Sequence, residues 1–479
     1  MSDSPTYQSP LGTRYASPAM QQLWSAQRRA GVWRRLWLAL AEEQQRLGID
    51  IPDEAVTQMR LHLDDADLTE VRTYEQRLRH DVMAHIHHFG DQAPAARPFL
   101  HLGATSCFVT DNADLIIQRD ALRLTLGRLA AVIRALSDFA MAHRALPTLA
   151  YTHYQPAQLT TVGKRASLWL QDFVLDAETI HDVVAALPFR GCKGTTGTQA
   201  SYLELFAGDH GKVAELDQRM ATVFEFPQAI AVSGQTYTRK IDGRIAGCLA
   251  GVAESASKFG NDLRLLQHER ELLEPFERDQ VGSSAMAYKR NPMRAERICA
   301  LARYVISLQQ NAHYTTATQW LERTLDDSAN RRLSIPDAFL GADAILVLAT
   351  NVAAGLEVQE PMVARNVERE MPFMATERWL MLGVGVGGDR QNLHEVIRQH
   401  SHEVAERVAR GEPNDLVEQL AACDEFSALD TGALRAELDP HLYVGRAPEQ
   451  VLEFVQGPVA RLLASLETFS TIDKAVVNV

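Results

Sequence analysis

The 479-residue sequence has few cysteines, and no two of them have Cys-x-x-Cys spacing. The five cysteines are odd in number: Cys107, Cys192, Cys248, Cys299 and Cys423. A disulfide framework and a zinc-finger fold are therefore both disfavoured. Free thiols in a reducing compartment are the simplest interpretation, so we expect a cytoplasmic protein.

The sequence also lacks targeting, membrane-spanning and basic segments. Residues 1–5 are not the basic stretch followed by an apolar one that begins a signal peptide. No uninterrupted apolar run approaches the ~20 residues that span a bilayer. The formal net charge of -13 disfavours sequence-independent nucleic-acid binding, which needs a basic face. We therefore predict neither a membrane nor a nucleic-acid partner.

What the sequence has in abundance is helical periodicity, while strand signals are scarce. Apolar residues recur in alternating steps of three and four along residues 122–140, 245–266, 298–308 and 339–356, and a further helix is expected over residues 164–187. This spacing places the apolar side chains on one stripe of each helix. Stripes sustained over three heptads predict long helices packed at a shallow angle in a bundle.

We therefore predict an all-α fold with three domains, at residues 1–111, 112–364 and 365–479. Helices of ~25 residues in the middle domain would be ~37 Å long. One chain does not readily cover every side of so long a bundle. We expect oligomerisation through the central helices.

The segment between two of the predicted helices, residues 280–292, is small and polar and has the sequence QVGSSAMAYKRNP. We expect an exposed, mobile loop. Asn291 suits the N-cap and Pro292 the first position of the following helix. From these residues alone, a connecting loop is a more common interpretation than a functional one.

Two segments carry histidines. His153 lies in THYQPAQ at residues 152–158, where a hydrogen-bonded junction residue and a catalytic one are equally good interpretations. Residues 80–88 hold four histidines, but without an i, i+4 pair or a His-Glu-x-x-His motif, so we predict no metal site. His80, between Arg79 and Asp81, fits anion binding or proton transfer better.

Two more polar segments suit anions. Residues 191–199, GCKGTTGTQ, resemble a phosphate cradle, because glycines let backbone N–H groups approach an anion. The segment lacks the Gly-Lys-Ser/Thr ending of a P-loop, which disfavours a nucleoside triphosphate site. Residues 322–332, ERTLDDSANRR, fit either a solvated turn or a cluster in which Arg323 and Arg332 hold carboxylate or phosphate.

Together these segments resemble one family. Residues 282–292 resemble the signature loop GSSxMPxKxNP of the fumarase/aspartase superfamily, except that Ala287 replaces a proline. Residues 9–17, 79–81, 105–106, 152–158, 235–237 and 322–332 resemble adenylosuccinate lyases within that superfamily. The likeness runs from about Tyr7 to the last helices. Alanine at position 287 should leave the open loop more flexible, and it removes no reacting group.

The resemblance implies an enzyme, a carbon–nitrogen lyase of purine nucleotide biosynthesis that uses no cofactor. Its substrates would be adenylosuccinate, cleaved to AMP and fumarate, and the related succinylated imidazole-carboxamide ribotide (SAICAR), cleaved to AICAR and fumarate. The fold implied is all-α with three domains. Long helices of the middle domain would form the core of a homotetramer, with each active site shared among three subunits.

The resemblance also assigns residues to the β-elimination. Ser283 would be the general base and His153 the general acid, with Glu296 as the partner of His153. Lys289 and Asn291 would stabilise the carboxylate on which charge develops, and His80 would bind the substrate and assist proton transfer. The implied substrate contacts are polar and rich in arginine: Arg14, Tyr15, Arg79, Asp81, Thr105, Ser106, Gln235, Asn291, Arg297, Arg323, Ser328 and Arg332.

Three alternatives remain open. Another superfamily enzyme, such as argininosuccinate lyase, fumarase or a cycloisomerase, would share the Ser-Ser loop but would not need the anion contacts at residues 14–15 and 79–81. A catalytically silent scaffold protein would have lost some of the catalytic residues, all of which are present. A nucleotide-binding regulatory module would have no use for a loop that carries a base.

Overall fold

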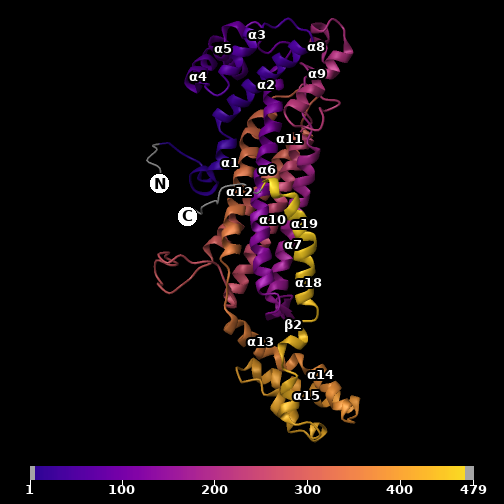
Figure 1. The fold of residues 1–479 in the computed structure, drawn as a ribbon. Helices are drawn as coiled ribbons and strands as arrows, with labels where there is room; N and C mark the ends of the chain where they lie inside the picture. The colour runs from indigo at the N-terminus through magenta and orange to yellow at the C-terminus, as the bar shows by residue number, and fades with distance from the viewer. Residues whose placement is uncertain (1–5, 470–479) are drawn as a thin grey trace.

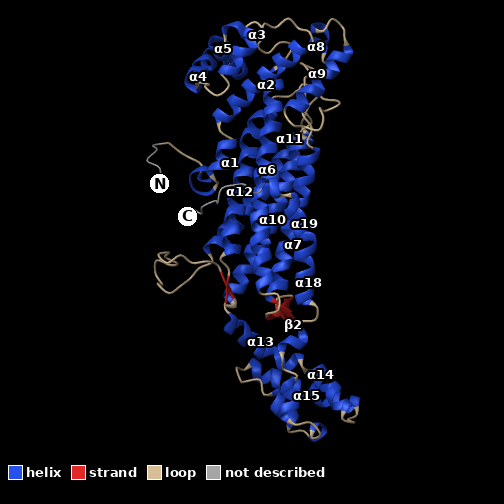
Figure 2. Ribbon diagram, in the orientation of Figure 1, coloured by secondary structure: helices blue, strands red, loops and turns tan. Residues whose placement is uncertain are grey.

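The structure is a computed structural model that describes residues 6–469, and its regular secondary structure is almost wholly helical (Figure 2). A bundle of long helices forms the middle of an elongated molecule, with groups of shorter helices at both of its ends (Figure 1). The predicted all-α fold is confirmed.

Five long helices make the bundle, and each predicted stripe lies in one of them, apart from Leu356, which follows the last of these helices. They are α6 (Ser106–Ala142), α7 (Val162–Ala186), α10 (Lys240–His268), α11 (Met293–Ala317) and α12 (Asp326–Ala354). In α6 the stripe residues Leu126, Leu129 and Ile133 are fully buried, because other helices pack around α6. By length and composition α12 could cross a membrane, but 61% of its most apolar window is buried inside the protein, as in the core helix of a bundle.

Short helices cover the end of the bundle at which α6 begins (Figure 1). They are α2 (Ala26–Arg46), α3 (Asp53–Leu61), α4 (Leu68–Leu78), α5 (Asp81–Gln92), η2 (Pro94–Ala96), α8 (Ala200–Leu205) and α9 (His210–Val223). The preceding η1 (Leu11–Tyr15) and α1 (Pro18–Leu23) lie against α12. Trp33, Leu36 and Trp37 of α2 join the apolar core of the bundle, so this end and the bundle share one core.

The opposite end has a core of its own, in which Trp379, Leu393 and Phe426 are buried. It consists of α13 (Glu360–Met374), α14 (Thr376–Gly385), α15 (Arg390–Ala409), α16 (Leu416–Ala421), η3 (Asp424–Phe426), α17 (Thr431–Ala436) and η4 (Pro440–Tyr443). The chain then returns along the bundle as α18 (Ala447–Phe454), η5 (Val455–Val459), α19 (Ala460–Ser465) and η6 (Glu467–Phe469). The domain boundaries at residues 111 and 364 stay predictions.

A β-hairpin follows α6, where a loop leading into a helix was expected. Its strands are β1 (Pro147–Thr152) and β2 (Gln155–Thr161), and a second small pair joins β3 (Leu272–Leu273) to β4 (Glu357–Val358). His153 and Tyr154 form the two-residue turn with positive φ angles of 54° and 60°, the conformation that suits the twist of a hairpin. Leu149 and Leu159 pair across the strands and pack on α13.

The predicted mobile loop lies between β3 and α11 and extends away from the bundle (the salmon-coloured loop in Figure 1). The expected N-cap at Asn291 is wrong, because α11 begins at Met293 and Pro292 precedes it. The carboxylate of Glu274 takes the capping role, accepting the backbone N–H groups of Arg294 and Ala295 at 3.0 and 2.9 Å. The Asn291 amide instead donates to the carbonyl of Gly282 at 2.8 Å, which ties the two ends of the loop together.

Candidate active site

A pocket of about 900 Å³ lies where α5, the start of α6 and the start of α12 meet. Eight of the predicted site residues line it: Arg79, His80, Asp81, Ser106, Gln235, Arg323, Ser328 and Arg332. Thr105 precedes Ser106 as the N-cap residue of α6. Segments up to about 250 residues apart in the sequence therefore converge in one place.

The reversal of the chain between α4 and α5 positions His80. Arg79 ends α4 with a φ of 55°, and His80 caps α5 by accepting the backbone N–H of Met83 at its Nδ1, at 3.3 Å. A neutral ring with Nδ1 as acceptor carries its proton on Nε2, which lies 3.4 Å from the hydroxyl of Ser106. His80 thus presents an N–H group toward the pocket side of α6.

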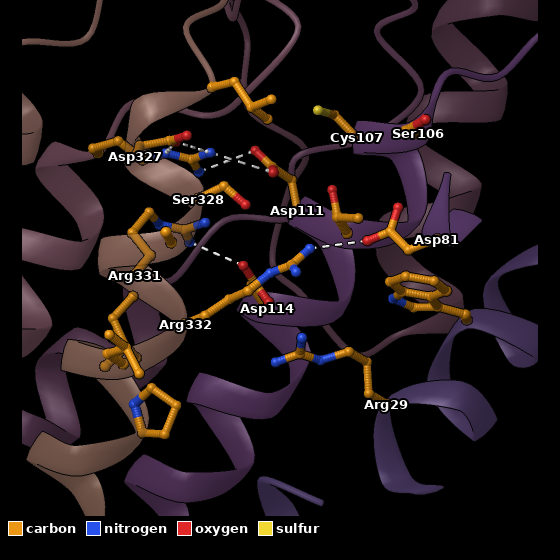
Figure 3. Close-up of a pocket in the computed structure, with 18 of the residues that line it drawn as sticks. Arg29, Asp81, Ser106, Cys107, Asp111, Asp114, Asp327, Ser328, Arg331 and Arg332 are labelled. Carbon is orange, nitrogen blue, oxygen red and sulfur yellow. Dashed lines mark hydrogen bonds and ion pairs between the residues drawn. The ribbon is translucent and has the colours of Figure 1, made fainter. Parts of the chain in front are cut away.

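Asp81 and Arg332 form an ion pair across the pocket, at 2.9 Å (Figure 3). The two side chains are 32% and 56% exposed, so the pair is hydrated. An exposed pair of this kind contributes little stability, roughly 0–1 kcal/mol. Both groups can therefore exchange partners with a ligand at small cost.

Beneath this rim lies a largely buried ion network, and the sequence analysis singled out only one of its members, Arg323. Arg239 pairs with Asp111 at 3.1 Å and with Asp327 at 2.8 Å, and Asp327 also pairs with Arg323 at 2.8 Å. Arg331 pairs with Asp242 at 2.7 Å and with Asp114 at 3.0 Å (the latter drawn in Figure 3). The network fixes the guanidinium groups of the pocket floor in place.

The electrostatics of the network follow from burial and pairing. Burial alone would raise the pKa of the Asp242 carboxyl, but Arg331 and Arg239 outweigh burial and lower that pKa below its ordinary value. Burial alone would lower the pKa of Arg331, but Asp242 and the nearby groups raise it well above its ordinary value. Each charge is therefore stable only because its partners are present.

The other predicted residues lie outside this pocket. Arg14 and Arg297 lie near the ring of Tyr15, with their guanidinium carbons 6.0 and 5.9 Å from its centre. His153 is exposed at the tip of the hairpin. Ser283, Lys289 and Asn291 lie on the extended loop, and Glu296 is an exposed residue in the first turn of α11.

The length of α6 separates these groups within one chain. Ser106 begins α6 next to His80, and the hairpin that carries His153 follows its end. A helix of 37 residues is ~55 Å long at ~1.5 Å per residue. Within residues 6–469 no hydrogen bond joins His153 to Glu296, its expected partner. The predicted acid and the pocket therefore cannot act on the same substrate molecule within a single chain.

Comparisons with known proteins identify the family. One family model, described as lyase, matches residues 40–307, and another, described as adenylosuccinate lyase C-terminus, matches residues 372–454. The adenylosuccinate lyase of Saccharomyces cerevisiae is 47% identical over 483 residues and covers 100% of both chains. That of Schizosaccharomyces pombe is 47% identical over 478 residues and covers 99% of each.

The chain belongs to the adenylosuccinate lyase family.

Solved structures agree with this assignment at the level of the fold. A fumarate lyase from Mesorhizobium sp. BNC1 superposes with a TM-score of 0.79 at 24% identity, over 95% of this chain and 100% of that chain. A 3-carboxy-cis,cis-muconate lactonizing enzyme from Pseudomonas putida gives a TM-score of 0.80 at 24% identity, over 96% and 99%. The resemblance to the fumarase/aspartase superfamily is confirmed, and the chain is a carbon–nitrogen lyase.

Sequence analysis missed the buried carboxylates of this lyase, although a signal for them exists. Asp111, Asp114 and Gln118 interrupt the apolar start of α6 at spacings of three and four, which places them on one side of the helix. All three line the pocket. A polar stripe within a buried helix thus marks the side that faces the site.

Proposed function

We propose that this lyase removes fumarate from adenylosuccinate to give AMP, and from SAICAR to give AICAR, in purine nucleotide biosynthesis. One observation carries the proposal. Six arginines line the 900 Å³ pocket of a chain that matches an adenylosuccinate lyase over the whole of that enzyme's length: Arg29, Arg79, Arg239, Arg323, Arg331 and Arg332. Such a surface suits the phosphate of the nucleotide, because the planar guanidinium donates two parallel hydrogen bonds to an anion.

In the proposed reaction, Ser283 removes the proton from the carbon next to a carboxylate. The electron pair left behind forms the double bond of fumarate and breaks the bond to nitrogen. His153 delivers a proton to the departing nitrogen. The Ser283 hydroxyl accepts the backbone N–H groups of Ala285 and Met286 at 3.3 and 3.1 Å, and such donors stabilise the developing alkoxide.

The remaining roles concern charge. Lys289 and Asn291, on the same loop, would stabilise the carboxylate that becomes doubly negative in the carbanion intermediate. Glu296 would hold the His153 imidazole in one tautomer and favour its protonated form. The scheme uses neither a metal nor an organic cofactor.

We also propose a homotetramer whose active sites are shared among three subunits. The separation of His80 from His153 by the length of α6 supports sharing. Leu168 and Leu175 on α7 and Leu265 on α10 are 46%, 52% and 44% exposed, which leaves apolar surface for another copy to cover. We place the enzyme in the cytoplasm, since all five cysteines are free thiols.

The test is to incubate the purified protein, without added metal or nucleotide, with adenylosuccinate and to measure AMP and fumarate. Ser283→Ala is assayed alongside. We expect wild type to release both products in equal amounts and the variant to release neither. A folded wild-type tetramer that gives no fumarate would refute the proposal, and argininosuccinate would then be tested.

A further inference from the structure

The glycine-rich segment at residues 191–199 has no part in the reaction scheme above, yet it lies beside the pocket. The backbone carbonyl of Thr195 accepts the side-chain amide of Gln235 at 3.0 Å, and Gln235 lines the pocket. Gly197 packs so closely that a Cβ there would lie 1.8 Å from the carbonyl oxygen of Ser233, the second residue before Gln235. The loop and this part of the pocket wall therefore form one unit.

The loop presents a row of unused donors. No backbone N–H from residue 194 to residue 198 donates a hydrogen bond to any residue between 6 and 469. Gly194 and Gly197 have positive φ angles of 76° and 85°, and Thr195, Thr196 and Thr198 are exposed. Successive amides in such a turn form a concavity that binds anions.

A buried positive charge lies behind the loop. The side chain of Arg190 is 0% exposed, and its guanidinium donates only to backbone carbonyls, those of Gly191, Gly194 and Gln235. Within the described part of the chain it forms no ion pair, and its Nε has no partner. A buried charge without a counter-ion is costly, and a bound anion would offset that cost.

We propose that residues 194–198 bind a carboxylate of the succinyl group, with Arg190 supplying the positive charge behind the amides. The inference rests on the proposed function. The donors of the loop are neutral amides and hydroxyls, which suit a singly charged carboxylate. The charged side chains Arg323 and Arg332, at the start of α12, suit the phosphate.

The test compares binding of fumarate and of AMP to the assembled enzyme by calorimetry, which does not depend on turnover. Thr196→Val/Thr198→Val removes two exposed hydroxyls of the loop, and Arg190→Gln removes the buried charge. We expect both to raise the fumarate Kd by roughly tenfold, as for the loss of one hydrogen bond to a charged group, while the AMP Kd stays within about twofold. Arg190→Lys should restore fumarate binding.

Lys193→Gln is the matched control, because Lys193 is an equally buried cation of the same loop that already pairs with Asp217. We expect it to change the melting temperature without changing the fumarate Kd. The proposal is overturned if the valine variant leaves the fumarate Kd unchanged, or if AMP weakens as much as fumarate. A wild type that binds fumarate but fails to cleave adenylosuccinate would refute the proposed function and leave the loop site standing.

Discussion

Mixing two inactive variants tests whether one site draws on several subunits. His80 lies at the start of α6 and His153 beyond its end, ~55 Å away, so a shared site must take these residues from different chains. We expect His80→Ala and His153→Ala each to lose activity, the latter by roughly 10²–10⁴-fold as for a missing general acid. When the two variants are mixed in one tetramer, we expect part of the activity to return.

The expected recovery follows from counting. When equal amounts of the two variants assemble at random, the chain that supplies His80 to a given site carries that histidine in half of the cases. The chain that supplies His153 to the same site carries it in half of the cases. About a quarter of all sites then hold both histidines, so activity should return to about a quarter of wild type. If each site were confined to one chain, mixing the variants would restore no activity.

The assay exchanges subunits by mild urea treatment and dilution, followed by measurement of fumarate release. Each variant passed alone through the same treatment is the control for damage and reactivation. If verified mixed tetramers stay as inactive as either variant alone, the sites are not shared. The assignment of His80 and His153 to one reaction from opposite ends of α6 would then be wrong as well.

Three further predictions concern the loop, the pH dependence of stability and the assembly. The Lys289 N–H donates to the Met286 carbonyl at 3.0 Å, which places Ala287 at the turn position that favours proline. Ala287→Pro should reduce the entropy that the open loop loses on closure by ~0.4–1 kcal/mol. We therefore expect kcat/KM to rise by roughly two- to fivefold. Ala287→Gly should lower it. Burial lowers the pKa of His101 from its ordinary value of 6.5 to about 4. Between pH 4 and pH 6.5 the unfolded chain therefore binds more protons than the folded one. The free energy of unfolding should fall as pH drops from 6.5 to 4. Urea denaturation at pH 7 and pH 5 measures the fall, which His101→Asn should reduce. Leu175→Glu should dissociate the proposed tetramer and abolish activity, as measured by light scattering and turnover. Leu61→Glu, at a 73% exposed residue of α3, should do neither.

The long helices could be predicted from the sequence, because apolar residues in alternating steps of three and four lie on one side of an α-helix and on no single side of a strand. The hairpin could not, since its turn residues His153 and Tyr154 are not the Asn-Gly type that usually signals positive φ angles. The start of α11 was also misplaced. Its cap comes from Glu274, about twenty residues upstream, and no local pattern identifies a distant capping carboxylate.

The site was predictable in parts. Arg79, His80 and Asp81 were found as one motif, and the structure brings them to the same pocket as Arg332, some 250 residues away. That convergence depends on how the helices pack, which a pattern within one segment does not encode. The polar stripe at the start of α6 could have been read from the sequence, but the pairing of its carboxylates could not, because their partners Arg239 and Arg331 lie elsewhere in the chain.

The charge of the pocket gives a further argument for assembly. Its six arginines face five carboxylates: Glu75, Asp81, Asp111, Asp114 and Asp327. Asp242, beneath the lining, also pairs with Arg331, so the pocket keeps no net positive charge for a ligand with a phosphate and two carboxylates. The cations that make up the difference must come from elsewhere, and Arg14, Arg297 and Lys289 lie outside the pocket of their own chain. Dissociated subunits should therefore lose affinity for AMP as well as turnover, and calorimetry on Leu175→Glu would reveal this loss. Unchanged AMP affinity in the dissociated variant would mean that one chain supplies the whole phosphate site.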